Sequence, residues 1–169
     1  MKNKVKIMDN FLNKDDFLMI KKIMFNKHFP WYYVNGVTST SNSSNGNFMF
    51  GHIFFDYETK NKITSHLYDS VINPILKKVK NKELLRAKAN CYTKNNKQTK
   101  HNYHIDNVID HNVLIFSLND CNGYTEFESG DKIESVENRA CFFNGKLKHR
   151  SVTQTNKNLR INLNLNYKI

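Results

Sequence analysis

Apolar and polar residues alternate along most of the second half of the chain. The longest such run is 159–167, where every second position is apolar. Side chains on a β-strand point alternately to opposite faces, so this pattern predicts a strand with one apolar and one polar face. Shorter strand-like runs precede it at 86–92, 113–119, 123–127 and 138–143. The chain is therefore expected to be almost entirely β from Glu83 onward.

The first half of the chain carries both helix and strand patterns. Alternation predicts a short strand at 5–12, and the mostly apolar run 48–55 predicts another. Asn13 has the position of a helix N-cap, followed by two first-turn acids and an apolar face, namely Asp15, Asp16, Phe17, Ile20, Ile23 and Met24. Apolar residues spaced four apart predict a second helix, bent or broken at Asn73-Pro74; they are Ile63, Leu67, Val71 and Ile75. The Ser/Asn-rich stretch 38–47 is expected to be a mobile loop.

Helices in the first half and strands in the second predict an α+β fold. The expected architecture is a double-stranded β-helix, or jelly roll, with N-terminal helices supporting one of its sheets. At 169 residues the chain is expected to form a single domain. Within it, 1–82 would supply helical support and a substrate loop, and 83–169 the jelly-roll core.

The formal net charge of +11 would ordinarily indicate a nucleic-acid partner. Only four of the 26 basic residues are arginine, however, and the lysines are spread along the chain. Specific recognition of phosphates and bases favours arginine, so nucleic acid is an unlikely partner on this composition.

No stretch of the sequence is apolar and long enough for a signal peptide or a membrane span. The three cysteines, Cys91, Cys121 and Cys141, show no metal-binding spacing. We therefore expect buried free thiols, a cytoplasmic protein and no membrane partner.

The sharpest chemical pattern consists of His104, Asp106 and a later histidine, His149. Two residues apart on an extended segment, His104 and Asp106 would point to the same face. His149 lies far enough along the chain to return on another strand. Two histidines and one carboxylate form the facial triad of non-heme Fe(II) oxygenases, although the same ligands also bind zinc. His101 and His111 flank the motif but do not share its spacing.

Arg160 lies in the alternating run 159–167, eleven positions beyond His149. Its planar guanidinium matches a carboxylate through two parallel hydrogen bonds. Burying that charge inside a barrel is costly unless such a partner binds. Arg160 is therefore a candidate anchor for an acidic co-substrate, and zinc hydrolysis gives no reason for it.

These residues, in this order and spacing, resemble the 2-oxoglutarate- and Fe(II)-dependent oxygenases, in particular their prolyl 4-hydroxylase-like branch. The resemblance extends from about Glu83 to Tyr167 and is weak before that. The segment 144–152 looks like the turn and strand that deliver the distal histidine in small phage-encoded members. The resemblance implies that His104, Asp106 and His149 bind Fe(II), and that Arg160 and the Tyr92 hydroxyl hold 2-oxoglutarate.

The same resemblance implies an O₂-dependent dioxygenase that hydroxylates a C–H bond and releases succinate and CO₂. The branch suggests a peptidyl substrate, including prolyl, or a small molecule. Substrate contacts are expected from Trp31, Tyr33 and Asn107, with Trp31 to Tyr33 forming a lid together with the loop 38–47. Core packing is the competing interpretation of this aromatic cluster, and the more common fate of such residues.

Three alternatives stay open on the sequence. A nucleic-acid dealkylase of the same superfamily would carry a second arginine six positions after Arg160, where this chain has Asn166. A non-catalytic jelly-roll protein would be expected to have lost a ligand, and none is lost. A cupin-like metal protein that does not use 2-oxoglutarate would leave Arg160 without a role.

Overall fold

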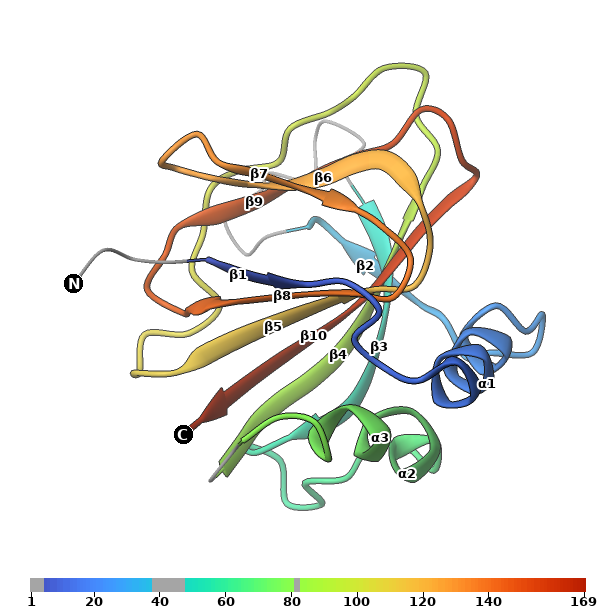
Figure 1. Ribbon diagram of the computed structural model, residues 1–169, viewed down its shortest axis with the longest axis vertical. Helices are drawn as coiled ribbons and strands as arrows, with labels where there is room; N and C mark the ends of the chain where they lie inside the picture. The colour runs from blue at the N-terminus through green and yellow to red at the C-terminus, as the bar shows by residue number, and fades with distance from the viewer. Residues whose placement is uncertain (1–4, 38–47, 81–82) are drawn as a thin grey trace.

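A computed structural model describes residues 5–37, 48–80 and 83–169, so the predicted loop at 38–47 lies outside the described residues. Two antiparallel sheets face each other, and three helices lie on the far side of the larger one (Figure 1). The larger sheet has the strand order β1-β8-β5-β10-β4-β3-β2 and the smaller one β7-β6-β9. This arrangement is the predicted jelly roll with N-terminal supporting helices.

The elements follow the predicted order of the chain. In the first half they are β1 (Lys6–Met8), α1 (Lys14–Met24), β2 (Tyr32–Asn35), β3 (Phe48–Asp56), α2 (Tyr68–Val71) and α3 (Asn73–Leu76). In the second half they are β4 (Glu83–Thr93), β5 (Asn112–Ser117), β6 (Cys121–Phe127), β7 (Lys132–Ser135), β8 (Arg139–Asn144), β9 (His149–Val152) and β10 (Leu159–Lys168).

The main apolar core lies between the helices and the outer face of the large sheet. Every second residue of β4 and β10 faces this core, as the alternation predicts, and the helices contribute their apolar stripes. The buried members include Phe17, Ile20, Met24, Ala87, Ala89, Cys91, Ile161, Leu163 and Leu165. A smaller cluster of Val113, Ile115, Phe127, Cys141 and Phe143 packs between the two sheets at one end. The polar residues of β4 and β10 are thereby turned toward the space between the sheets.

The first helix forms as its sequence predicts. The Asn13 side chain accepts a hydrogen bond of 2.9 Å from the backbone N–H of Asp16 and so caps the helix. Asp15 and Asp16 occupy the first turn, where the partial positive charge of the helix end favours acids. The apolar face buries Phe17, Ile20 and Met24 against the sheet.

The second predicted helix is shorter than its apolar spacing indicated. Helical structure begins only at Tyr68 and is broken into α2 and α3 beside Asn73-Pro74, as predicted. Ile63 is not helical, because it pairs as a β-bridge with Phe55. Ile63 is 53% exposed and lies outside the core, so its spacing from Leu67 did not reflect a shared buried face.

Other elements also differ from the prediction. The first strand ends at Met8 rather than reaching Leu12. The short strands β2 and β7 were not predicted, since neither alternates clearly. The stretch 94–106, expected to be strand-like, is mostly irregular. No helix among the described residues is both long and apolar enough to cross a bilayer.

Candidate metal centre

The two metal-ligand histidines lie directly opposite each other on neighbouring antiparallel segments. His149 begins β9, and His104 pairs with it through a β-bridge. Their backbones exchange two hydrogen bonds of 3.0 Å, and their rings lie 4.7 Å apart between centroids. Cross-strand register thus joins two histidines that are far apart in the sequence.

Each histidine also bonds to the backbone of its own segment. The Nδ1 atom of His149 lies 3.0 Å from the carbonyl oxygen of Leu147, and that of His104 lies 3.3 Å from the carbonyl of Asn102. A carbonyl only accepts, so Nδ1 carries the proton and donates in both rings. Each Nε2 is left with a free lone pair, which is the form that binds a metal ion.

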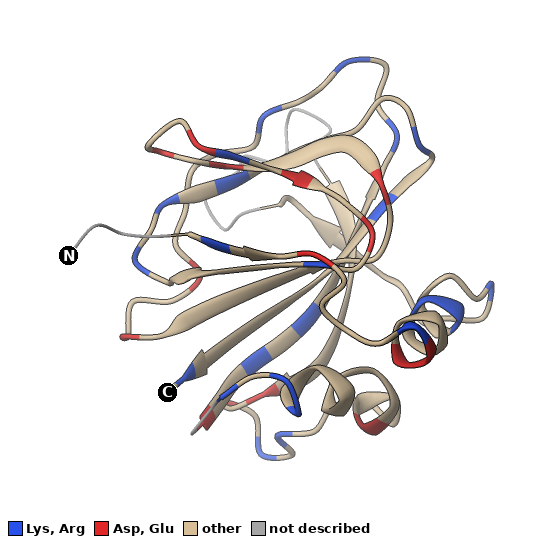
Figure 2. Ribbon diagram, in the orientation of Figure 1, with Lys and Arg blue, Asp and Glu red and all other residues tan. Residues whose placement is uncertain are grey.

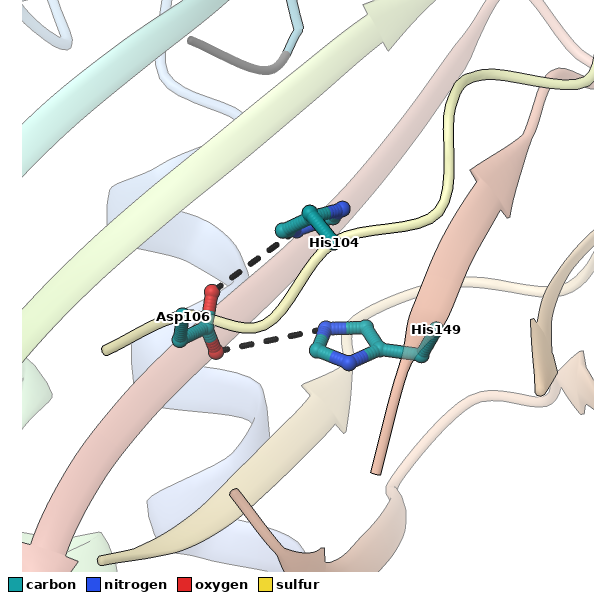
Figure 3. Close-up of side chains that lie close together, drawn as sticks. All are labelled: His104, Asp106 and His149. Atoms are coloured by element: carbon teal, nitrogen blue, oxygen red, sulfur yellow. Dashed lines mark ion pairs between the residues drawn. The ribbon is translucent and has the colours of Figure 1, made fainter. Parts of the chain in front are cut away.

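Asp106 stands on a bend just after His104 and points back toward both imidazoles (Figure 3). The segment is not the regular strand that the two-residue spacing suggested, yet the two side chains converge. Its Oδ1 lies 3.8 Å from His104 Nε2, and its Oδ2 lies 4.0 Å from His149 Nε2. The bend gives the carboxylate the same direction that strand alternation would have given it.

Three donors bond to the Asp106 carboxylate. Arg86 Nη2 donates to Oδ1 at 3.2 Å, and the amides of Asn164 and Asn166 each donate to Oδ2 at 3.0 Å. Burial alone would raise the pKa of Asp106. The nearby His149 and Arg86, together with the two amides, outweigh that effect and hold the pKa at about 2. The carboxylate is therefore ionised and oriented at neutral pH.

The donor set fits a transition-metal ion. The three ligand atoms lie within 4.8 Å of one another. Ligands on one face of an octahedral ion, with bonds of about 2.1 Å, lie about 3 Å apart, so each atom has to move by less than about 1 Å. Burial and His149 lower the pKa of His104, which keeps its ring neutral and available.

Arg160 is the largest fully buried side chain of the described residues and is only 2% exposed. Its Nε donates to the Ser135 hydroxyl at 2.6 Å and its Nη2 to the Thr125 hydroxyl at 3.3 Å. Its Nη1 is buried with no hydrogen-bond partner among the described residues. The guanidinium as a whole forms no ion pair with any of them. A buried cation with a free donor fits an anionic ligand.

Two neighbours shape the space around Arg160. A methyl group on Gly123 would lie 2.8 Å from Arg160 Cδ and 3.0 Å from the carbonyl oxygen of Val152, so only glycine leaves room there. Tyr92 lies directly opposite Arg160 on β4, with the guanidinium carbon 5.3 Å from its ring centroid. Burial raises the pKa of Tyr92, so its hydroxyl stays protonated and able to donate.

One cavity of about 350 Å³ joins these groups. It lies against the inner face of β4 and β10. Its lining includes all three candidate metal ligands together with Tyr92 and Arg160. Five residues that the sequence singled out for iron and 2-oxoglutarate therefore share one enclosure.

The candidate substrate residues are placed differently. Trp31 packs against Phe29 at 4.6 Å between ring centroids and joins the edge of the core, which agrees with the competing interpretation of core packing. Tyr33 is 62% exposed on β2 and does not line the cavity among the described residues. Asn107 lines a neighbouring hollow. Residues 34–37, directly after the predicted aromatic cluster, line the cavity instead.

The two flanking histidines have other partners. His101 bonds through Nδ1 to the Ser151 hydroxyl at 2.6 Å and stacks on Tyr92. Burial and the nearby Arg160 lower the pKa of His101 to about 4. His111 bonds to the carbonyl of Ile109 at 2.8 Å. Neither His101 nor His111 belongs to the metal-ligand cluster.

Sequence reasoning missed the polar wall of the cavity. Arg86 and Lys88 on β4 and Asn162 and Asn164 on β10 all line it. The signal was present, because these residues alternate with the apolar positions that predicted the strands. Alternation alone does not tell whether a polar face meets bulk water or an enclosed site.

No family model matches the sequence, and no curated protein is similar to it in sequence. Solved structures do match. A prolyl hydroxylase from Trichoplax adhaerens, in complex with a hypoxia inducible factor oxygen degradation domain peptide fragment, has a TM-score of 0.66 and 17% identity, covering 99% of this chain and 84% of that chain. A 2OG-Fe(II) oxygenase family oxidoreductase from Burkholderia pseudomallei has a TM-score of 0.68 and 11% identity, covering 97% and 84%. A Pseudomonas putida prolyl-4-hydroxylase has a TM-score of 0.64 and 11% identity, covering 99% of this chain and 94% of that chain.

At these identities the likeness establishes the fold. The chain has the jelly-roll fold of 2OG-Fe(II) oxygenases, prolyl hydroxylases among them, as the resemblance in sequence implied. Because one fold supports many reactions, the chemistry has to be argued from the site itself. The likeness to small phage-encoded members stays a prediction.

Proposed function

We propose that the protein is an Fe(II)- and 2-oxoglutarate-dependent dioxygenase that hydroxylates a C–H bond of a peptidyl, including prolyl, or small-molecule substrate. When bound, iron and 2-oxoglutarate supply the chemistry: O₂ is reduced, 2-oxoglutarate yields succinate and CO₂, and one oxygen atom enters the C–H bond. A reducing compartment such as the cytoplasm suits both Fe(II) and the three buried free cysteines.

The observation that carries this proposal is the buried, incompletely bonded Arg160 in the same cavity as the triad. A metal site alone fits several activities. A cupin-like protein that does not use 2-oxoglutarate, or a non-catalytic jelly roll, would keep an uncompensated guanidinium in its interior at a cost of several kcal/mol. An acidic co-substrate removes that cost.

The residues of the chain then have distinct roles. His104, Asp106 and His149 hold the metal, and their Nδ1 and amide partners keep the ligands in the binding orientation. Arg160 binds the carboxylate of 2-oxoglutarate that is remote from the metal, and the Tyr92 hydroxyl donates to it. The enclosing sheets limit the access of water to the reacting groups.

An anaerobic titration tests the proposal. Purified protein is titrated with Fe(II) and then with 2-oxoglutarate, and the visible charge-transfer band of a metal-chelated keto acid is followed. We expect the band in the wild type and its loss in Arg160→Met at modest 2-oxoglutarate concentration. Arg139→Met is the matched control, because Arg139 is paired with Asp9 away from the cavity. Bound iron without a band in the wild type would refute the proposal.

A further inference from the structure

Lys88 occupies a position that is unusual for a lysine. It lies in the middle of β4, which is flanked on both sides by other strands of the large sheet. Its side chain is half-buried and lines the cavity. Basic residues are spread over most of the molecule, yet they also form bands along this interior strand (Figure 2). Lysine is normally found where its ammonium group is fully solvated.

The lysine tail follows a defined path. Gly51 on β3 lies beneath it, because a methyl group there would come within 3.0 Å of Lys88 Cε and 3.3 Å of Val34 Cγ2. Val34 also lines the cavity. Lys88 Cε thus lies beside β3 and β2, whereas the Arg160 guanidinium is bonded to Ser135 and Thr125 of the small sheet, so the two cations occupy different parts of the cavity.

The other two cations of the cavity already have partners. Arg86 bonds to Asp106, and Arg160 is assigned to the co-substrate. Lys88 makes no hydrogen bond or ion pair with any described residue, Asp106 included. Burial lowers the pKa of Lys88 to about 8, so it is still mostly protonated at neutral pH.

The charge of the cavity is not balanced. Its described lining holds three cationic side chains and one anionic one, an excess of two positive charges. The remaining segments 1–4, 38–47 and 81–82 contain no Asp or Glu that could neutralise it. Asp56 and Glu58 line a neighbouring hollow instead. A divalent metal ion and dianionic 2-oxoglutarate cancel one another, so the excess persists in the loaded site.

We propose that Lys88 binds an oxyanion of the substrate, a carboxylate or a phosphate, and so selects anionic substrates. This inference rests on the proposed function and names the substrate class of the same site. The neighbouring amides of Asn90 and Asn162, which bond to each other at 3.1 Å, provide further polar groups on the same wall. A cavity of about 350 Å³ is small for a ligand pocket, so it admits a small molecule or a single side chain.

The test uses two simple probes, inorganic phosphate and acetate. Protein loaded with Zn(II) and saturating 2-oxoglutarate is titrated with each probe, and amide chemical shifts are followed by NMR. We expect a saturable shift of residues around Lys88. The probe that binds more tightly identifies the oxyanion class. In Lys88→Met the dissociation constant should rise at least about tenfold, and in Lys88→Arg it should stay within about threefold.

Lys14→Met serves as the control, since Lys14 is exposed on α1 away from the cavity, and its affinity should equal that of the wild type. Unchanged shifts outside the cavity show that Lys88→Met is folded. Equal affinity in Lys88→Met would mean that the metal or another group binds the anion, and would overturn the inference, as would the absence of saturable binding. Failure of 2-oxoglutarate to bind would count against the proposed function instead, and the same titrations of the zinc-loaded protein would still report on Lys88.

Discussion

Replacing Arg160 by methionine should separate stability from binding. In the ligand-free protein the guanidinium is buried with two hydroxyl partners and one free donor. Desolvating an uncompensated charge costs several kcal/mol, and the two hydrogen bonds recover only part of it. Methionine removes that cost but leaves two hydroxyls without their donor, at about 1 kcal/mol each. We therefore expect Arg160→Met to be as stable as the wild type or up to about 2 kcal/mol more stable.

Binding should respond in the opposite direction. Losing a buried charge pair costs about 2–5 kcal/mol, which raises the dissociation constant of 2-oxoglutarate roughly 30-fold to several thousand-fold. At a ligand concentration of about 100 times the wild-type dissociation constant, the wild type gains about 2.7 kcal/mol of stability. At the same ligand concentration, Arg160→Met should gain less than about 1 kcal/mol of stability from 2-oxoglutarate.

Urea unfolding of the zinc-loaded proteins, with and without 2-oxoglutarate, measures both quantities. Arg139→Met is the control: it loses a surface ion pair with Asp9 worth up to about 1 kcal/mol and should keep the full ligand-induced gain. The reasoning is refuted if Arg160→Met loses more than about 3 kcal/mol without ligand, or if 2-oxoglutarate stabilises it as much as the wild type.

Three further predictions follow from the surroundings of the site. Gly123→Ala should raise the dissociation constant of 2-oxoglutarate at least about tenfold in calorimetry, because the added methyl would lie 2.8 Å from Arg160 Cδ; an unchanged value would show that Arg160 can move aside. Asn166→Ala should weaken zinc binding about 10- to 100-fold in a chelator competition, because Asn166 donates to Asp106. Asn162→Ala should leave zinc binding unchanged, because Asn162 bonds to Asn90 and not to Asp106. The pKa of His101 is lowered from 6.5 to about 4 in the folded protein. As the pH falls from 6.5 to 4, the unfolded chain therefore binds a proton at His101 before the folded protein does, and the free energy of unfolding decreases by up to about 3 kcal/mol. Unfolding curves of His101→Gln should lose that slope, and an equal slope in both proteins would contradict the assignment.

The sequence predicted the residues of the candidate site better than it predicted the secondary structure of the segments that connect them. His104, Asp106, His149, Arg160 and Tyr92 could be found because residue type and spacing restrict metal and carboxylate binding, and the structure brings them to one cavity. Their roles as ligands stay predictions.

The errors have physical reasons. Ile63 has helical spacing but pairs with Phe55 and is 53% exposed, so its apolar character did not mark a core-facing position. Lys88 was read as one of many dispersed lysines, because charge composition does not show which side of a strand is enclosed. Tyr33 was expected near the substrate; its side chain is 62% exposed on the edge strand β2, and its role stays a prediction.

The two faces of β4 and β10 have different roles, and this has an evolutionary consequence. Odd-numbered positions such as Ala89 and Leu163 supply the packing that keeps the chain folded, and even-numbered positions such as Lys88 and Asn162 supply the chemistry. Substitutions on one face leave the other nearly untouched, because neighbouring side chains point in opposite directions. A lineage can therefore exchange one substrate for another through a few alternate positions on two strands while the scaffold stays intact. A directed library at the same positions would use that freedom.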